Sequence, residues 1–143
     1  MTTQATAPTP TKKPLVPYLV LPEDGSEPYL QGSSCPQCKQ NYVGARRFCA
    51  KCSYVGDLKP IKLSKEGTLH VWTIIYQSVP GIATPYIGAI VDLPEGVSVK
   101  GNIAGIEPKP ENLKFGMKLR MRFEQMTTDR EGNTLFGYVF EPA

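Results

Sequence analysis

The sequence of 143 residues predicts a mainly β fold in three consecutive parts, on the strength of three observations. The first residues are polar and rich in Thr and Pro, and all four cysteines lie between positions 35 and 52. After position 59, apolar and polar side chains alternate with a period of two, the spacing of half-buried strands. We therefore expect a flexible tail (1–17), an N-terminal arm with a cysteine-bearing unit (18–58) and an antiparallel barrel (59–143).

The tail, "MTTQATAPTPTKKPLVP", has too few large apolar residues to bury a core, so it is expected to be flexible. It also lacks the apolar segment of a secretory signal. No window of about 18 apolar residues is present, so we expect no membrane span. These features predict a cytoplasmic protein whose thiols stay reduced.

The cysteines form the pattern C-x2-C-x10-C-x2-C, with thiols at Cys35, Cys38, Cys49 and Cys52. In a reducing compartment, paired CxxC motifs indicate a metal site rather than disulfides. Two facing CxxC turns make a tetrahedral, all-sulfur site, which suits Zn²⁺. Iron, in a rubredoxin-like site or an iron–sulfur cluster, is the alternative. It is disfavoured because the second knuckle, "CAKC", lacks the proline of "CPQC".

Four thiolates leave no open position on the metal, whereas catalytic zinc keeps one for water or substrate. We therefore expect one structural zinc ion per chain. We expect no catalytic residue in this chain. The metal would use every cysteine, and the chain has one histidine, His70. No free thiol nucleophile and no base with its orienting partner would remain, so the chain is not expected to be an enzyme on its own.

Positive charge is concentrated around the cysteines. Residues 31–65 carry seven basic side chains and one acidic side chain, a net charge of +6, while the whole chain has +3. These bases either offset the negative charge of a zinc–tetrathiolate centre or form a binding face for a phosphorylated or acidic partner. Both interpretations stay open at the level of sequence.

The third part contains five expected strands, at 68–79, 85–93, 97–106, 117–126 and 134–142, separated by Gly- and Pro-containing turns. In the fourth strand, Leu119 and Met121 would face inward while Arg120 and Arg122 face outward. Short helical turns are expected within 22–30 and 108–115. Five strands without a substantial helix predict a five-stranded antiparallel barrel of the OB type.

OB barrels and zinc ribbons both occur in proteins that bind single-stranded nucleic acid. Outward bases on the fourth strand and the aromatic residues Trp72, Tyr76, Tyr86 and Phe136 agree with that function. Against it, residues 66–143 have a net charge of −2, which does not favour a polyanion. Nucleic-acid binding is therefore the alternative function.

Four segments carry a family resemblance: "GSSCPQCKQNYVGARRFCAKC", "GTLHVWTIIYQSVPGIATPYIGAIVDLPEG", "KGNIAG" and "YVFEPA". Over roughly residues 20–143 the chain resembles the acyl-CoA-associated proteins built from a rubredoxin-like zinc ribbon and an OB-fold. The resemblance implies a non-catalytic subunit that forms a hetero-oligomer with a thiolase-like catalytic subunit. The complex would process acyl-CoA as a thiolase or acyltransferase, with this subunit stabilising its partner and helping to form the acyl-CoA site. Anaerobic aromatic (toluene and benzylsuccinate) degradation is a pathway in which the resemblance implies that such a complex acts.

Given that resemblance, a coenzyme A thioester becomes the expected ligand of the complex. Its 3′-phosphate and diphosphate suit Arg and Lys side chains. We expect Arg46 and Arg47 to be the first contacts, with Lys39 and Lys51 next. The apolar loop at 78–86 is either a docking surface for a partner or acyl chain, or an ordinary turn.

Overall fold

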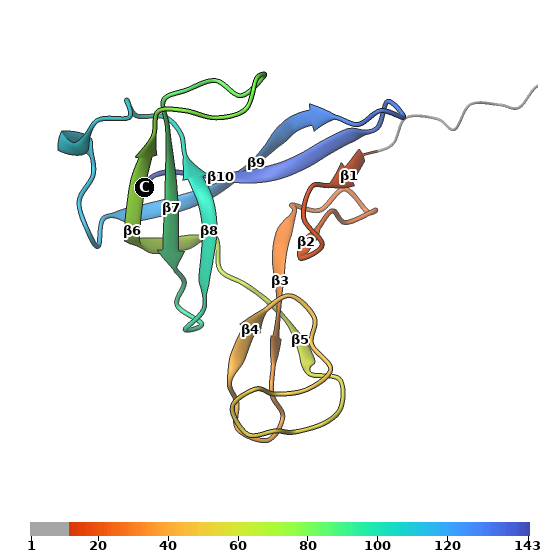
Figure 1. Cartoon of the computed structure of the whole chain (residues 1–143). Helices are drawn as coiled ribbons and strands as arrows, with labels where there is room; N and C mark the ends of the chain where they lie inside the picture. The colour runs from red at the N-terminus through yellow and green to blue at the C-terminus, as the bar shows by residue number, and fades with distance from the viewer. Residues whose placement is uncertain (1–11) are drawn as a thin grey trace, which may run out of the picture.

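The structure is a computed structural model, and it describes residues 12–143. Two β-units lie one above the other, a barrel and a smaller ribbon that carries the cysteines (Figure 1). The mainly β fold class is thus confirmed. The first eleven positions of the expected tail lie outside the described residues.

The barrel consists of five strands: β6 (Glu66–Ile75), β7 (Tyr86–Asp92), β8 (Ser98–Ile103), β9 (Lys118–Thr128) and β10 (Thr134–Pro142). Their order is β10-β8-β7-β6-β9, and a further pairing of β10 with β9 closes the sheet. All pairings among the five are antiparallel except β8 with β10, which is parallel. This is the closed five-stranded barrel that the sequence predicts.

A short strand, β1 (Lys12–Pro14), pairs in parallel with β10, from Lys12 opposite Thr134 to Pro14 opposite Phe136. These residues fall in the segment predicted to be a flexible tail, so the described end of that segment is ordered against the barrel. Pairing explains the difference, because β10 offers its backbone groups to a passing chain. The division of the chain at 17 and 58 otherwise stays a prediction.

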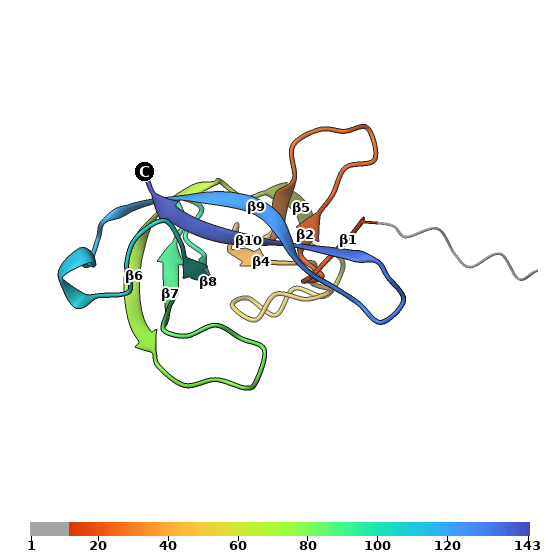
Figure 2. The same cartoon turned by 90° about the horizontal axis from the view of Figure 1, so that it is seen from above.

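Two local expectations differ from the structure. The strand expected at 68–79 ends at Ile75, and residues 76–85 form a loop to β7 that projects beyond the strands (Figure 2). Pro80 and Pro85 have no N–H to donate to a ladder, which disfavours a strand there. The helical turn expected within 22–30 is wrong: Gly25 has φ +82°, and Asp24 Oδ1 accepts a hydrogen bond from Ser26 N at 2.9 Å, which makes a turn. The turn expected within 108–115 is a 3-10 helix, Pro110–Asn112.

The barrel core follows the alternation in sequence. Leu119 and Met121 are buried, while Arg120 between them and Arg122 after them are exposed. Gly101 on β8 is required by packing, because a Cβ there would lie 2.7 Å from the ring of the fully buried Phe140. Burying side chains of this size stabilises the fold by about 1.5–3 kcal/mol each.

The ribbon consists of β2 (Leu19–Val20), β3 (Tyr29–Ser34), β4 (Asn41–Val43) and β5 (Lys59–Lys62). β3 lies in its centre and pairs antiparallel with the other three. Leu19, Leu30 and Leu63 join the buried cluster of the barrel, so one apolar core extends into the base of the ribbon. The far end of the ribbon has its own small cluster around the cysteines and Leu58.

Candidate metal centre and basic ribbon face

The two CxxC motifs form the same turn twice. After the first, the N–H of Lys39 donates to the carbonyl of Cys35 at 3.0 Å; after the second, the N–H of Ser53 donates to the carbonyl of Cys49 at 2.9 Å. Lys39 and Ser53 have φ of 65° and 64°, a left-handed conformation that non-glycine residues rarely adopt. Each turn brings the two thiols of its motif to one side of the chain.

The turns face each other across the end of the ribbon. The Sγ atoms of Cys35 and Cys52 are 3.6 Å apart, those of Cys38 and Cys49 are 3.5 Å apart, and all four lie within 4.8 Å of one another. None of the four is in a disulfide within residues 12–143. A tetrahedral zinc ion with bonds of about 2.3 Å holds its sulfur ligands about 3.8 Å apart, so the donor atoms fit such an ion. The structure thus brings the four predicted ligands into one zinc-ribbon-like cluster.

Tyr42 on β4 extends this cluster. Its hydroxyl lies 3.3 Å from Cys49 Sγ, to which it can donate, and it accepts a hydrogen bond from the N–H of Ala50 at 3.1 Å. In the metal-free protein the hydrogen bond from Tyr42 lowers the pKa of Cys49 to about 6, while burial raises the pKa of Cys52 to about 12. The hydroxyl therefore favours the thiolate form that metals bind.

The Arg46 guanidinium lies 4.3 Å from the centre of the Tyr42 ring, at a distance where a cation is attracted to the aromatic face. Arg46, Tyr42 and Cys49 thus form a continuous contact from the ribbon surface to the sulfur cluster. The sequence analysis did not single out Tyr42, because its one signal is that it is an aromatic residue in the spacer between the two motifs.

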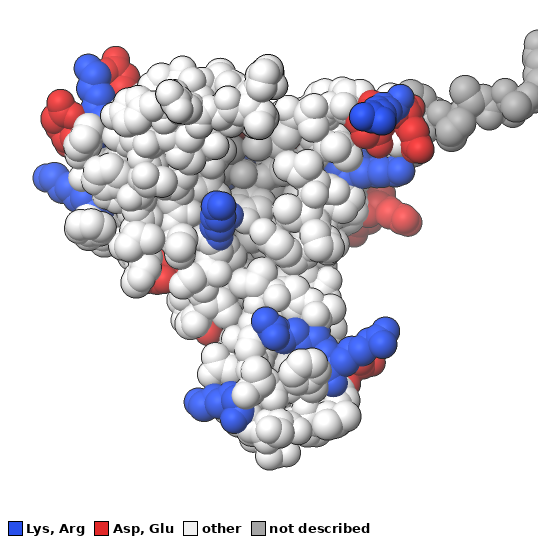
Figure 3. Space-filling view, in the orientation of Figure 1, with Lys and Arg blue, Asp and Glu red and all other residues white. Residues whose placement is uncertain are grey.

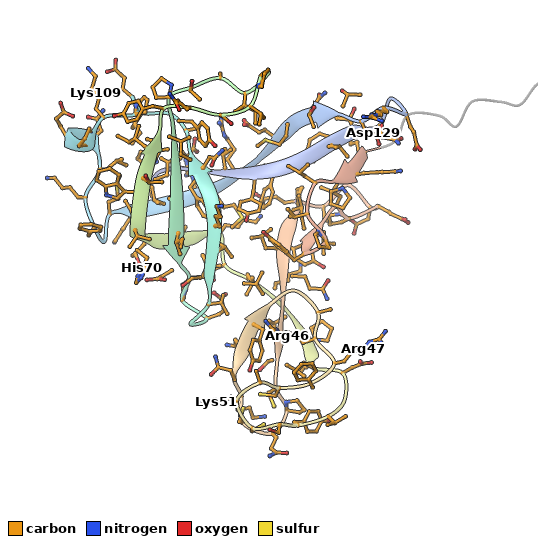
Figure 4. All side chains as sticks on the ribbon, viewed as in Figure 1. Arg46, Arg47, Lys51, His70, Lys109 and Asp129 are labelled. Atoms are coloured by element: carbon orange, nitrogen blue, oxygen red, sulfur yellow. The ribbon has the colours of Figure 1, made fainter. Side chains whose placement is uncertain are left out.

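The four predicted phosphate contacts are only partly brought together. Arg46 and Arg47 line one surface depression of about 490 Å³ together with Asp57, Leu58 and Pro60. Lys51 projects from another side of the ribbon (Figure 4), and Lys39 lies in the first cysteine turn. All four side chains are exposed, and none forms an ion pair within residues 12–143. Of the four predicted phosphate contacts, Arg46 and Arg47 are therefore the two that share a depression.

The outward bases of β9, Arg120 and Arg122, differ from the ribbon bases because they form ion pairs. Arg120 donates to Glu141 at 3.1 Å, and Arg122 lies 3.1 Å from Glu124 and 3.8 Å from Glu141. Their charges are thus offset within the barrel. In Figure 3 the viewed barrel face is largely uncharged, and basic side chains gather on the ribbon below it.

His70 lies on the exposed side of β6. Its Nδ1 is 3.0 Å from Asp92 Oδ2, and the Ser98 hydroxyl donates to the other oxygen of the same carboxylate at 2.6 Å. The serine and histidine both contact the acid rather than each other. A hydrolytic triad requires the hydroxyl to donate to the histidine, so this group lacks that arrangement.

No helix within residues 12–143 is long and apolar enough to cross a bilayer. By its fold and its site, the protein belongs to the class that joins a zinc-ribbon-like cysteine cluster to a closed OB barrel. The family model "ChsH2, C-terminal OB-fold domain" matches residues 61–124 of the sequence. On these grounds, and on the similarity to whole proteins given next, the chain belongs to the DUF35 family.

The "DUF35 domain-containing scaffold protein" of Pyrococcus furiosus is 31% identical over 100 residues, which cover 68% of this chain and 71% of that protein. Benzoylsuccinyl-CoA thiolase subunit BbsA of Thauera aromatica is 27% identical over 136 residues, 92% of each chain. Among solved structures, the Ltp2-ChsH2(DUF35) aldolase is similar with a TM-score of 0.64 and 25% identity, covering 80% of this chain and 84% of that one. The family predicted from sequence is thereby confirmed.

Proposed function

We propose that this protein is the non-catalytic, zinc-holding subunit of a thiolase-like complex that processes acyl-CoA. The observation that carries the proposal is the four-cysteine cluster, which commits every thiol of the chain to one site. The relatives support it, since they are named as scaffold proteins, as a thiolase subunit and as part of an aldolase. The thiolase-like partner would supply the nucleophilic cysteine and its acid and base groups.

Cys35, Cys38, Cys49 and Cys52 would hold one Zn²⁺ ion per chain. Bound there, the ion supplies structural cross-linking of the two cysteine turns, which a segment of this size needs in order to fold. The chain's own residues prepare the site, because the turns orient the thiols and Tyr42 stabilises the Cys49 thiolate. Iron is the alternative ion, and its visible absorption would reveal it.

A coenzyme A thioester is the proposed ligand of the complex, with its phosphates at Arg46 and Arg47. These two exposed guanidinium groups line one depression and have no ion-pair partner within residues 12–143. Lys51 and Lys39 would add positive charge at longer range. Similarity to BbsA supports a thiolase as the partner. Anaerobic aromatic degradation as the pathway and the cytoplasm as the location are part of the same proposal.

Single-stranded nucleic acid is less well supported. OB barrels bind such ligands on the second and third strands and on the loop between the first and second. Here the corresponding loop, residues 76–85, carries no charge. The outward arginines of β9 are paired with glutamates. A polyanion gains most of its affinity from clustered unpaired bases. The second and third barrel strands, β7 and β8, carry one base, Lys100.

The proposal is tested by producing the chain with a thiolase-like subunit encoded beside it and purifying through a tag on this chain. We expect a hetero-oligomer with one zinc ion per copy of this chain. In the complex, Arg46→Ala/Arg47→Ala should raise the KM for acyl-CoA about tenfold with little change in kcat, since each lost contact to a phosphate weakens substrate binding.

The matched control is Lys109→Ala/Lys114→Ala, which also removes two exposed bases, on either side of the 3-10 helix Pro110–Asn112. Figure 4 shows Lys109 at the end of the barrel away from the ribbon. This control should leave KM unchanged. Equal effects of the two double variants would indicate a general loss of positive charge and would count against a phosphate site at Arg46 and Arg47. Purification of the chain without a thiolase-like partner would overturn the proposed function.

A further inference from the structure

An uncharged segment crosses the middle of the chain. From Val71 to Val91, 21 consecutive residues include no Asp, Glu, Lys, Arg or His, although 20% of the whole chain is charged. The segment comprises the second half of β6, the loop 76–85 and nearly all of β7. Its members are therefore neighbours in space as well as in sequence.

Five large apolar side chains of this segment are exposed to solvent, and we call them the uncharged patch: Tyr76 (66% exposed), Val79 (64%), Ile82 (52%), Val71 (42%) and Ile90 (38%). They are half of the exposed large hydrophobic residues of the described chain. Beside them lies a hollow of about 330 Å³, lined by Val71, Trp72, Ile75, Ile90 and other β6 and β7 residues, with Lys100 at its side. Exposed apolar side chains that come from one uncharged segment and lie beside a hollow are typical of an interaction site.

The loop holds these side chains outward. Within residues 76–85 the structure contains one backbone hydrogen bond, from Ile82 N to Val79 O at 3.3 Å. All ten residues of the loop are exposed, so the loop does not fold back to bury Val79 or Ile82 against the barrel. The apolar side chains at its tip are thus available to a partner.

We propose that the uncharged patch is the surface on which the thiolase-like catalytic subunit docks. The inference rests on the proposed function and names the face of the barrel that the partner covers. The absence of charge argues for an apolar protein surface rather than a nucleic acid, which needs bases. A free acyl chain needs an enclosing pocket, and side chains that are 38–66% exposed do not provide one.

The position of the patch favours the same partner. The barrel face above the ribbon is largely uncharged, and the ribbon bases lie below it on the same side of the molecule (Figure 3). A protein seated on the barrel face would extend over Arg46 and Arg47, which are proposed to hold the phosphates of its substrate. One docking orientation therefore serves both the apolar contact and the anion contact.

The test compares Val79→Asp and Ile82→Asp with Val55→Asp, in which the same residue type is replaced at an 85% exposed position on the ribbon. Binding of each full-length variant to the thiolase-like subunit is measured by calorimetry, after thermal unfolding has shown that the variants are folded. We expect Val79→Asp and Ile82→Asp to weaken binding at least tenfold, because each buries a charge in an apolar interface. Val55→Asp should stay within twofold of the wild type.

Retention of full affinity in both patch variants, with a wild type that binds, would overturn the docking surface and leave the proposed function standing. Equal weakening by all three variants would also overturn it. A wild type that binds no thiolase-like subunit would reject the proposed function together with this inference. If the chain alone forms a dimer that Val79→Asp dissociates, and the affinity for the thiolase-like subunit is unchanged, the patch joins two copies and the proposal is wrong.

Discussion

The carboxylate of Glu95 accepts two hydrogen bonds from Ser64, one from the backbone N–H and one from the hydroxyl, both at 2.7 Å. Ser64 lies between the ribbon strand β5 and the barrel strand β6, and Glu95 lies in the turn between β7 and β8. The backbone carbonyl of Glu95 also accepts a hydrogen bond from the Asn41 side chain of β4 at 2.9 Å. This turn of the barrel therefore holds the ribbon in place.

Replacing Glu95 by Ala should lower the free energy of unfolding by about 2–3 kcal/mol, because it removes two hydrogen bonds to a carboxylate. Urea denaturation measures the effect. The control is Glu107→Ala, which removes an exposed carboxylate paired with Lys109 at 2.9 Å and should cost less than about 1 kcal/mol. Equal losses in the two variants would contradict the role of Glu95 at the junction.

Tyr42→Phe should weaken zinc binding about tenfold, since it removes the hydroxyl that donates to Cys49, and such outer contacts tune metal affinity. Competition with a chromophoric chelator measures the affinity. Tyr76→Phe serves as the control, because Tyr76 is exposed on the barrel loop, away from the cysteines. An unchanged affinity in Tyr42→Phe would show that the hydroxyl does not act on the bound thiolate.

Removal of the metal by a chelator, or the substitution Cys38→Ser, should unfold the outer ribbon and leave the barrel folded. The cluster at the cysteines contains only Leu58 as a further fully buried residue in the described chain, whereas the barrel has its own large core. Hydrogen exchange should accelerate in β4 and β5 but not in β7 and β8. Loss of protection across the barrel as well would mean that the two units fold as one.

Tyr138 makes the stability of the fold decrease at alkaline pH. Burial, together with its hydrogen bond to Tyr18 at 2.9 Å, raises the pKa of the Tyr138 phenol above the ordinary value of 10.0. The folded state thus retains its proton at a pH where the unfolded chain releases it. The stability contribution is complete below pH 10 and decreases as pH rises above it.

In Tyr138→Phe this alkaline decrease should be smaller, while stability at neutral pH should drop by about 1 kcal/mol through loss of the hydrogen bonds to Tyr18 and to the carbonyl of Lys100. Urea midpoints between about pH 7 and about pH 11 measure both effects. Tyr76→Phe should keep the wild-type slope. A wild-type slope in Tyr138→Phe would assign the alkaline limit to other groups.

The sequence predicted the fold from two patterns, the alternation of apolar and polar residues and the spacing of the cysteines, and each pattern spans only a few neighbouring residues. The alternation around Leu119 and Met121 defines which face of β9 is buried, and the CxxC spacing defines each cysteine turn. The end of β6 at Ile75 was missed because β-branched and aromatic residues continue beyond it, and only the prolines further on indicate the loop.

The supporting contacts of the site could not be predicted in the same way. Glu95 and Ser64 are 31 residues apart and meet through the packing of the barrel against the ribbon. The contact of Arg46 with Tyr42 depends on how the ribbon hairpin folds back. The same folding separates Lys51 from Arg46 and Arg47, although all three are close in sequence (Figure 4). Spacing alone therefore predicts the ligands but not the residues that hold them.

The thiolase activity of the separated subunits tests the central claim most directly. This chain, the thiolase-like subunit and the reconstituted complex are each assayed for thiolysis of 3-oxoacyl-CoA compounds with free coenzyme A, beginning with the compound for which the BbsA relative is named. We predict no activity for this chain alone at any concentration and full activity only for the complex. Thiolysis by this chain in the absence of a partner would contradict the assignment of its cysteines to a metal and of the chemistry to another subunit.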